Sequence, residues 1–192
     1  IYAWFPNNVN PSTGEVRGST INNGIAASGK NYFTIKNITV LHPKFRGISL
    51  SSCDNAIIDG VTVSYPNEKG IYAISGCDYN NVKNSTVNYA NHIGIEIFGT
   101  NNTIEDNNVT STALFVNLGL TGLGSWYMGS GIYVEGNDNL IRYNKVINTG
   151  YNGIHIEYRN TVEYNYIKNC NLTKDDGGGI YNDTNCNLEL FN

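Results

Sequence analysis

The dipeptide Gly-Ile recurs along this chain at a nearly constant interval. It opens seven similar segments, and the steps between them measure 23, 23, 24, 37, 22 and 26 residues. A fixed period of roughly 20–50 residues is typical of repeat architectures, in which each repeat packs on its neighbours. The segments are GIAAS, GISLS, GIYAI, GIEIF, GIYVE, GIHIE and GIYND, beginning at Gly24, Gly47, Gly70, Gly94, Gly131, Gly153 and Gly179.

Each repeat also contains a second pattern, in which two aliphatic residues flank a smaller or polar one. The copies read IKNITV, IDGVTV, VKNSTV, IEDNNV, IRYNKV and VEYNYI. The central column becomes asparagine in the last three copies, at Asn107, Asn144 and Asn165. We interpret this column as an inward ladder of amides, which bond to turn backbone that would otherwise be unsatisfied.

Repeats this short favour a solenoid of β-strands. The chain contains 32 Asn, 21 Gly and 14 Tyr, and these residues together with Ile, Val and Thr favour turns and strands. Successive coils would pair as parallel strands about 4.8 Å apart, so that isolated aliphatic residues pack on their counterparts in the next coil. We therefore predict an all-β fold of about seven coils of roughly 22–26 residues. A Greek-key sandwich would not keep a fixed period.

The repeat, written N-x-I/V followed by G-I-x-hydrophobic, resembles that of the right-handed parallel β-helix proteins of the pectate-lyase-like superfamily. The resemblance covers roughly Asn23 to the C-terminus. It implies a right-handed, single-stranded parallel β-helix with one domain over residues 1–192, coils from about residue 23 and an insertion loop at 111–130. The superfamily includes polysaccharide lyases, glycoside hydrolases, epimerases, phage tailspikes and non-enzymatic surface proteins. The segment from Gly131 to Tyr181 is also similar to segments of large secreted bacterial β-helix proteins, several of which are assigned to glycan breakdown.

The charge of the chain argues against two classes of partner. The net charge is −4, whereas nucleic acids and anionic membrane surfaces attract clustered Lys and Arg. No stretch of 18 apolar residues exists, so we expect no membrane span. The chain opens on IYAWFP without an initiator Met or a signal peptide, and we treat it as part of a longer, extracellular or periplasmic chain.

Two outward-facing columns change character along the predicted helix. Residues two and four positions after each Gly point outward, and they change from Ala and Ser in the early coils to aromatic and acidic residues in the late coils. Rings beside carboxylates suit a sugar, because rings stack on apolar C–H faces while acids bond to hydroxyl groups. Ordinary solvent-facing strand residues are the alternative. The late columns contain Glu96, Tyr133, His155 and Tyr181, and Glu135, Glu157 and Asp183.

Glu135 and Glu157 share one of these columns on adjacent coils. Two carboxylates about 4.8 Å apart repel, so one should have a raised pKa or a cation should lie between them. The spacing suits the acid pair of a retaining glycosidase, and it equally suits a Ca²⁺ site completed by Asp183. His155, in the neighbouring column, is either a proton shuttle or a stacked surface residue.

Two further segments add candidate residues. Asp175 and Asp176 precede three glycines, which allow a sharp turn that carries the acids over the predicted groove. In the β-helix glycosidases that the chain resembles, an acid beside such a strand is often catalytic, and the alternative is an ordinary acidic turn. The insertion contains Trp126, which either covers the core or forms a sugar platform.

We therefore predict a carbohydrate-active β-helix that binds and cleaves a polysaccharide or oligosaccharide on its late coils. Hydrolysis is favoured over elimination, because a lyase needs a cation and a basic residue and the chain lacks a lyase fingerprint. The alternative is a non-catalytic adhesin, tailspike-like or glycan-binding module. The catalytic candidates are Glu157, Asp176, Asp175, His155 and Glu135; the substrate-binding candidates are Tyr133, Tyr181, Glu96, Trp126 and Arg142; and the candidate Ca²⁺ ligands are Glu135, Glu157 and Asp183.

Overall fold

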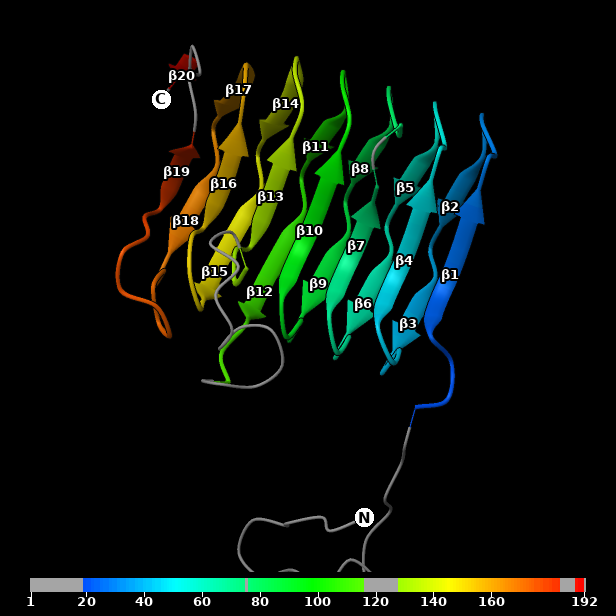
Figure 1. The fold of residues 1–192 in the computed structure, drawn as a ribbon, viewed down its shortest axis with the longest axis horizontal. Helices are drawn as coiled ribbons and strands as arrows, with labels where there is room; N and C mark the ends of the chain where they lie inside the picture. Colours follow the sequence, from blue (N-terminus) through cyan, green and yellow to red (C-terminus); the bar gives the residue numbers. More distant parts are fainter. Residues whose placement is uncertain (1–18, 75, 116–127, 184–188, 192) are drawn as a thin grey trace, which may run out of the picture.

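The computed structural model describes residues 19–74, 76–115, 128–183 and 189–191, and these form strands joined by short turns (Figure 1). The described residues contain no helix, and so none that is long and apolar enough to cross a membrane. Each of the first six coils contributes one strand to each of three parallel sheets, and the last described coil contributes to two of them. The prediction of an all-β parallel solenoid of about seven coils is confirmed.

The three sheets run the whole length of the solenoid. The first sheet contains β1 (Asn23–Ser28), β4 (Arg46–Ser51), β7 (Lys69–Ala73), β10 (Ile93–Phe98), β13 (Ile132–Glu135), β16 (Ile154–Glu157) and β19 (Ile180–Asp183). The second contains β2 (Thr34–Lys36), β5 (Ile57–Asp59), β8 (Asn81–Lys83), β11 (Thr103–Glu105), β14 (Asn139–Arg142), β17 (Asn160–Glu163) and β20 (Glu189–Phe191). The third contains β3 (Thr39–Leu41), β6 (Thr62–Ser64), β9 (Thr86–Asn88), β12 (Asn108–Thr112), β15 (Lys145–Thr149) and β18 (Tyr166–Lys168).

The core is built from ladders of like side chains. Ile95 pairs with Ile132, and Ile132 pairs with Ile154 on the next coil. All three are fully buried, as the alternation along the Gly-Ile strands predicts. Burying one such side chain stabilises the fold by about 1.5–3 kcal/mol, so the ladders supply the main driving force for folding.

The predicted asparagine ladder lies at the corner between the second and third sheets. Asn107 donates its backbone N–H to Oδ1 of Asn144 over 3.1 Å, and Asn144 donates in the same way to Asn165 over 2.9 Å. The side-chain amide of Asn144 also donates to the carbonyl oxygen of Ile104 over 2.8 Å. The inward amides thus satisfy buried turn backbone, as predicted.

A second asparagine ladder, which the sequence reasoning missed, lies at the corner between the first and second sheets. Asn80 donates its backbone N–H to Oδ1 of Asn102, Asn102 to Asn139 and Asn139 to Asn160, over 2.8–2.9 Å. All four side chains are buried. Each occupies the N of the N-x-I/V pattern, so the repeat itself contained the signal.

The corners next to the ladders use left-handed backbone. Tyr143 and Tyr164, which directly precede the ladder residues Asn144 and Asn165, have φ angles of 55° and 51°. This conformation costs an ordinary L-residue about 1–2 kcal/mol. The two rings stack with centroids 5.3 Å apart, which offsets part of that cost.

Cys53 and Cys77 stack at one corner of adjacent coils. Both are buried free thiols, and the backbone N–H of Cys53 points at the sulfur of Cys77 over 3.4 Å. This corner therefore contains a pair of stacked thiols and not a disulfide.

Replacing Asn144 with leucine tests the first ladder. Asn144→Leu would leave the buried N–H of Asn107 and the carbonyl of Ile104 without their partners, at about 1–3 kcal/mol for each group. We expect the free energy of unfolding to fall by about 3 kcal/mol in chemical denaturation. Asn108→Leu is the control, because its side chain points outward from β12, and it should change stability by only about 0.5 kcal/mol. Equal losses in the two variants would contradict the ladder.

Candidate functional site

The late aromatic and acidic residues lie on the outward face of the first sheet, in the predicted register. Tyr133 pairs with His155, and His155 pairs with Tyr181. The rings of both pairs meet edge to face with centroids 5.1 Å apart. In the parallel column, Glu135, Glu157 and Asp183 are also partners on successive strands.

Much of this outward face is nevertheless buried, and the expectation of a solvent-facing column is wrong there. Tyr133 and His155 are at most 1% exposed, and Glu157 is 6% exposed. Tyr133 packs between Phe98, whose ring centroid is 5.7 Å away, and His155. Side chains of neighbouring coils thus form an outer packed layer over the sheet, while Glu135, Tyr181 and Asp183 remain half-buried.

Tyr133 connects the two glutamates of the acidic column. Its hydroxyl makes a short hydrogen bond with Oε1 of Glu157 and lies 3.1 Å from Oε2 of Glu135. A hydroxyl has only one proton to donate, so both contacts are favourable only if one carboxyl is protonated. Burial raises the pKa of Glu157, as do the nearby charges of Glu135 and Asp183, although the Tyr133 hydroxyl acts in the opposite sense. Burial and the neighbouring charges thus favour the protonated form of Glu157.

His155 is a buried neutral imidazole. Asn152 accepts a hydrogen bond from the N–H of Gly178 over 2.8 Å, which turns its amide nitrogen toward Nδ1 of His155, 3.2 Å away. Nδ1 is then the acceptor, so the ring carries its proton on Nε2. Burial lowers the pKa of His155 to about 4, although Asp183 acts against this shift. The ring is consequently uncharged at neutral pH.

The segment that contains Asp175 and Asp176 follows the coil of β16 and carries both acids on the surface. Asp176 accepts a hydrogen bond from the hydroxyl of Tyr151; burial and this bond raise the pKa of Tyr151 to about 12. The ring of Tyr151 lies 6.4 Å from that of Tyr181. Asp176 is thereby tied to the aromatic group, whereas Asp175 is simply exposed.

Two predicted substrate-binding residues, Glu96 and Arg142, are not on the accessible part of the site, and a third lies outside the described residues. Glu96 is fully buried in an ion pair with Lys69, and burial raises its pKa despite that partner. Arg142 belongs to β14 in the second sheet, where its Nη2 bonds to Oε2 of Glu105 over 2.8 Å, so its assignment to this face is corrected. Trp126 lies outside the described residues.

A hollow of about 350 Å³ opens beside the acidic column. Gly99 and Gly136 occupy successive coils of one column and leave its floor without side chains. A Cβ at Gly136 would lie 2.0 Å from the carbonyl oxygen of Gly99, and its φ of 128° also suits only glycine. The residues around the hollow are Gly76, Asp78, Phe98, Gly99, Thr100, Glu135, Gly136, Asn137 and Tyr158.

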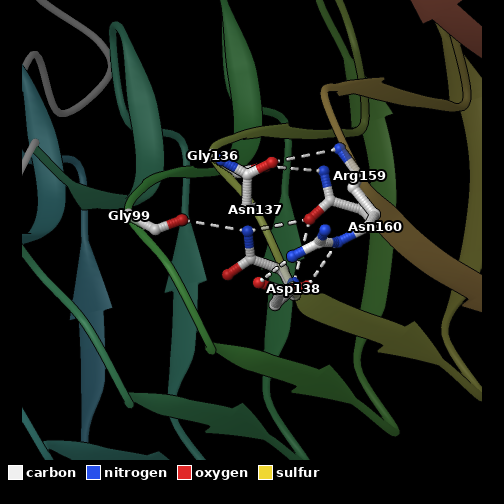
Figure 2. A network of polar contacts seen from close by, with 7 residues as sticks. Gly99, Gly136, Asn137, Asp138, Arg159 and Asn160 are labelled. Carbon is white, nitrogen blue, oxygen red and sulfur yellow. Dashed lines mark hydrogen bonds and ion pairs between the residues drawn. The ribbon is translucent and has the colours of Figure 1, made fainter. Parts of the chain in front are cut away.

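Polar contacts hold the turn that carries Gly136 and Asn137, two residues that line the hollow (Figure 2). Arg159 forms a two-pronged pair with Asp138, with both distances at 2.7 Å, and its backbone N–H donates to Asn137 over 3.4 Å. Asn160 donates its amide to the carbonyl of Gly136 over 2.9 Å. Sequence reasoning missed Phe98, Tyr158 and Asp78 as parts of a site. A signal for the hollow was present, because on two successive coils a glycine directly follows an outward residue, Phe98 on one and Glu135 on the next.

Within the ranges that the structure describes, no group of three or more His, Cys, Asp or Glu side chains is placed to hold a metal ion. Glu135, Glu157 and Asp183 share a column, but the Glu135–Glu157 approach is bridged by Tyr133. Binding of Ca²⁺ by these three residues stays a prediction.

Comparison with known proteins supplies the family. A family model described as a right-handed beta helix region matches residues 8–158, which is more than half of the chain. The chain belongs to the right-handed beta helix family. For this β-helix, searches of curated proteins and of solved structures gave no significant match. Family membership confirms the predicted fold and hand, but a fold does not specify a reaction, so the chemistry must be argued from the site.

The pKa of Glu157 should respond in opposite directions to two substitutions nearby. Tyr133→Phe removes the hydroxyl that stabilises the ionised carboxylate, so the pKa of Glu157 should rise. Glu135→Gln removes a like charge, so it should fall. NMR titration of the side-chain carboxyl carbon of Glu157 measures both shifts, and shifts in the same direction would contradict the bridging arrangement.

His155 should make stability depend on pH. Its pKa falls from 6.5 to about 4 on folding, so between these values the unfolded chain binds more protons and stability rises with pH. The contribution amounts to about 3 kcal/mol across that window. Glu96 and Glu157 act in the opposite sense, because their raised pKa values make stability fall as pH rises above about 4.5.

Comparing the parent with His155→Gln separates these effects, since both chains share the glutamates. Urea denaturation at several pH values between 4 and 6.5 should give a less positive slope of unfolding free energy against pH for the variant. Equal slopes would mean that His155 is not the buried neutral group described here.

Proposed function

We propose that this β-helix binds a glycan in the hollow and hydrolyses it. The observation that carries the proposal is the position of Glu135, which lines a hollow containing two aromatic residues and is connected through Tyr133 to the buried Glu157. Phe98 and Tyr158 provide apolar ring surface, and Asn137 and Thr100 provide hydrogen-bonding groups. A lining that combines aromatic ring surface with hydrogen-bonding groups suits a sugar ring.

The two glutamates would then divide the acid and base work. At rest the proton lies on Glu157, and Glu135 is the carboxyl that contacts the ligand. A proton passes from Glu157 to the oxygen of Tyr133 as Tyr133 passes its own proton to Glu135, so Tyr133 stays neutral. Glu135 then protonates the leaving glycosidic oxygen, and the hydroxyl of a water molecule adds to the anomeric carbon. The proton that this water gives up returns to the two glutamates and restores their starting state. Two carboxyls in different environments are the usual basis of such a division.

Elimination is less well supported than hydrolysis. A lyase needs a basic residue and a cation that neutralises the uronate. Neither Lys, Arg nor His is among the described residues that line the hollow, and His155 is buried. An extracellular or periplasmic location, where polymeric glycans occur, remains part of the proposal.

A glycan-binding module without catalysis is the second candidate. The burial of Glu157 and His155 favours it, because both side chains are held away from any ligand in the hollow. In that case the bonded network of Tyr133 would stabilise the outer layer and the hollow would only bind.

Substitution of the two glutamates distinguishes the candidates. On a glycan that the parent cleaves, released reducing ends should fall at least about a hundredfold in Glu135→Gln and in Glu157→Gln, the usual contribution of general acid catalysis. Both variants should still bind the glycan. Ser51→Ala, in the same column on an early coil, should cleave like the parent. A parent that binds a glycan without releasing reducing ends or an unsaturated product would support the non-catalytic module.

A further inference from the structure

We propose that the hollow selects a protonated amino sugar over a neutral sugar and excludes uronic acids. The inference rests on the proposed glycan binding and adds the charge of the substrate. Two carboxylates, Asp78 and Glu135, line the hollow, and the described lining contains no cationic side chain. Asp78 precedes the coil of Gly99 and Glu135 follows it, so a ligand over Gly99 meets negative charge on both sides.

Both carboxylates are fixed in place. Asp78 accepts a hydrogen bond from the backbone N–H of Thr100 over 2.7 Å, and its own N–H donates to Asp54 over 3.0 Å. Glu135 is held by the Tyr133 hydroxyl. Neither side chain can turn away from an anionic ligand without breaking these contacts, so the repulsion would persist in a complex.

Arg159 and Lys69 are both engaged with other acids. Arg159 is paired with Asp138, and Lys69 is paired with Glu96. They therefore offset little of the charge of Asp78 and Glu135. An ammonium group on the sugar would be attracted to both carboxylates and to the aromatic residues Phe98 and Tyr158. A uronate would bring a third carboxylate into the same space.

Binding of matched oligosaccharides tests this preference. Oligomers of glucosamine, N-acetylglucosamine and glucose with the same linkage differ only in the group at C2, and oligogalacturonate supplies the anionic case. We would measure binding by calorimetry at mildly acidic pH and low salt, in the Glu157→Gln background. That background keeps both carboxylates of the hollow and removes the proton reserve, so the ligand is not consumed.

The glucosamine oligomer should bind about tenfold more tightly than the two uncharged oligomers, since two charge pairs each contribute a modest gain. Added salt should reduce this ratio. Oligogalacturonate should not bind. Equal binding of the charged and uncharged oligomers, or binding of oligogalacturonate, would overturn the inference while leaving glycan binding intact. Failure of every oligomer to bind would contradict both the inference and the proposed function.

A matched pair of variants locates the effect. Asp78→Asn removes the charge but keeps the hydrogen-bond acceptor, as Asn31 does where it accepts the N–H of Asp54 over 2.9 Å. It should lower the preference for glucosamine from about tenfold to about threefold. Asp54→Asn changes the same corner column outside the hollow and should keep the full preference. An unchanged ratio in Asp78→Asn would contradict the assignment.

Discussion

Neighbouring coils lie at the spacing of parallel strands, about 4.8 Å, and every buried group must find its partner across that gap. Ile132 meets this constraint by packing against Ile95 and Ile154. Asn139 meets it by accepting the backbone N–H of Asn102 and donating to the carbonyl of Gly99. Because buried polar groups without partners are costly, two amide ladders hold the corners of the solenoid where the regular pairing of strands is interrupted.

The same spacing produces the chemistry of the site. Side chains in one column cannot move apart along the axis, so Glu135 and Glu157 remain neighbours whether or not their charges repel. Tyr133, from the adjacent column, places its hydroxyl between them, and Glu157 is buried whereas Glu135 is half-buried. The raised pKa of Glu157 thus follows from its burial and from this register, and Glu135 is the carboxyl that faces the hollow.

Sequence reasoning reached the features that depend on periodicity. The isoleucine ladders, the ladder through Asn144 and the alignment of Glu135 with Glu157 all follow from positions in a repeat. The ladder through Asn139 was missed although Asn139 is the Asn of the N-x-I/V pattern, because only the Asn inside the second pattern was interpreted as an inward column. The burial of His155 and the hollow could not be predicted in this way. They depend on which long side chains happen to lie on adjacent coils, as Phe98 does beside Tyr133, and on Gly99 and Gly136 falling on successive coils.

In the proposed mechanism, coil spacing holds one proton between two carboxyls that Tyr133 connects. Neutron diffraction from a deuterium-exchanged crystal at neutral pH would test it most directly, because it locates exchanged hydrogens. We expect one deuteron on the carboxyl of Glu157 and one on the hydroxyl of Tyr133 directed at Glu135. The account would be contradicted if both carboxyls carried no deuteron. In that case the deuteron of Tyr133 would point at Glu157 or at neither glutamate.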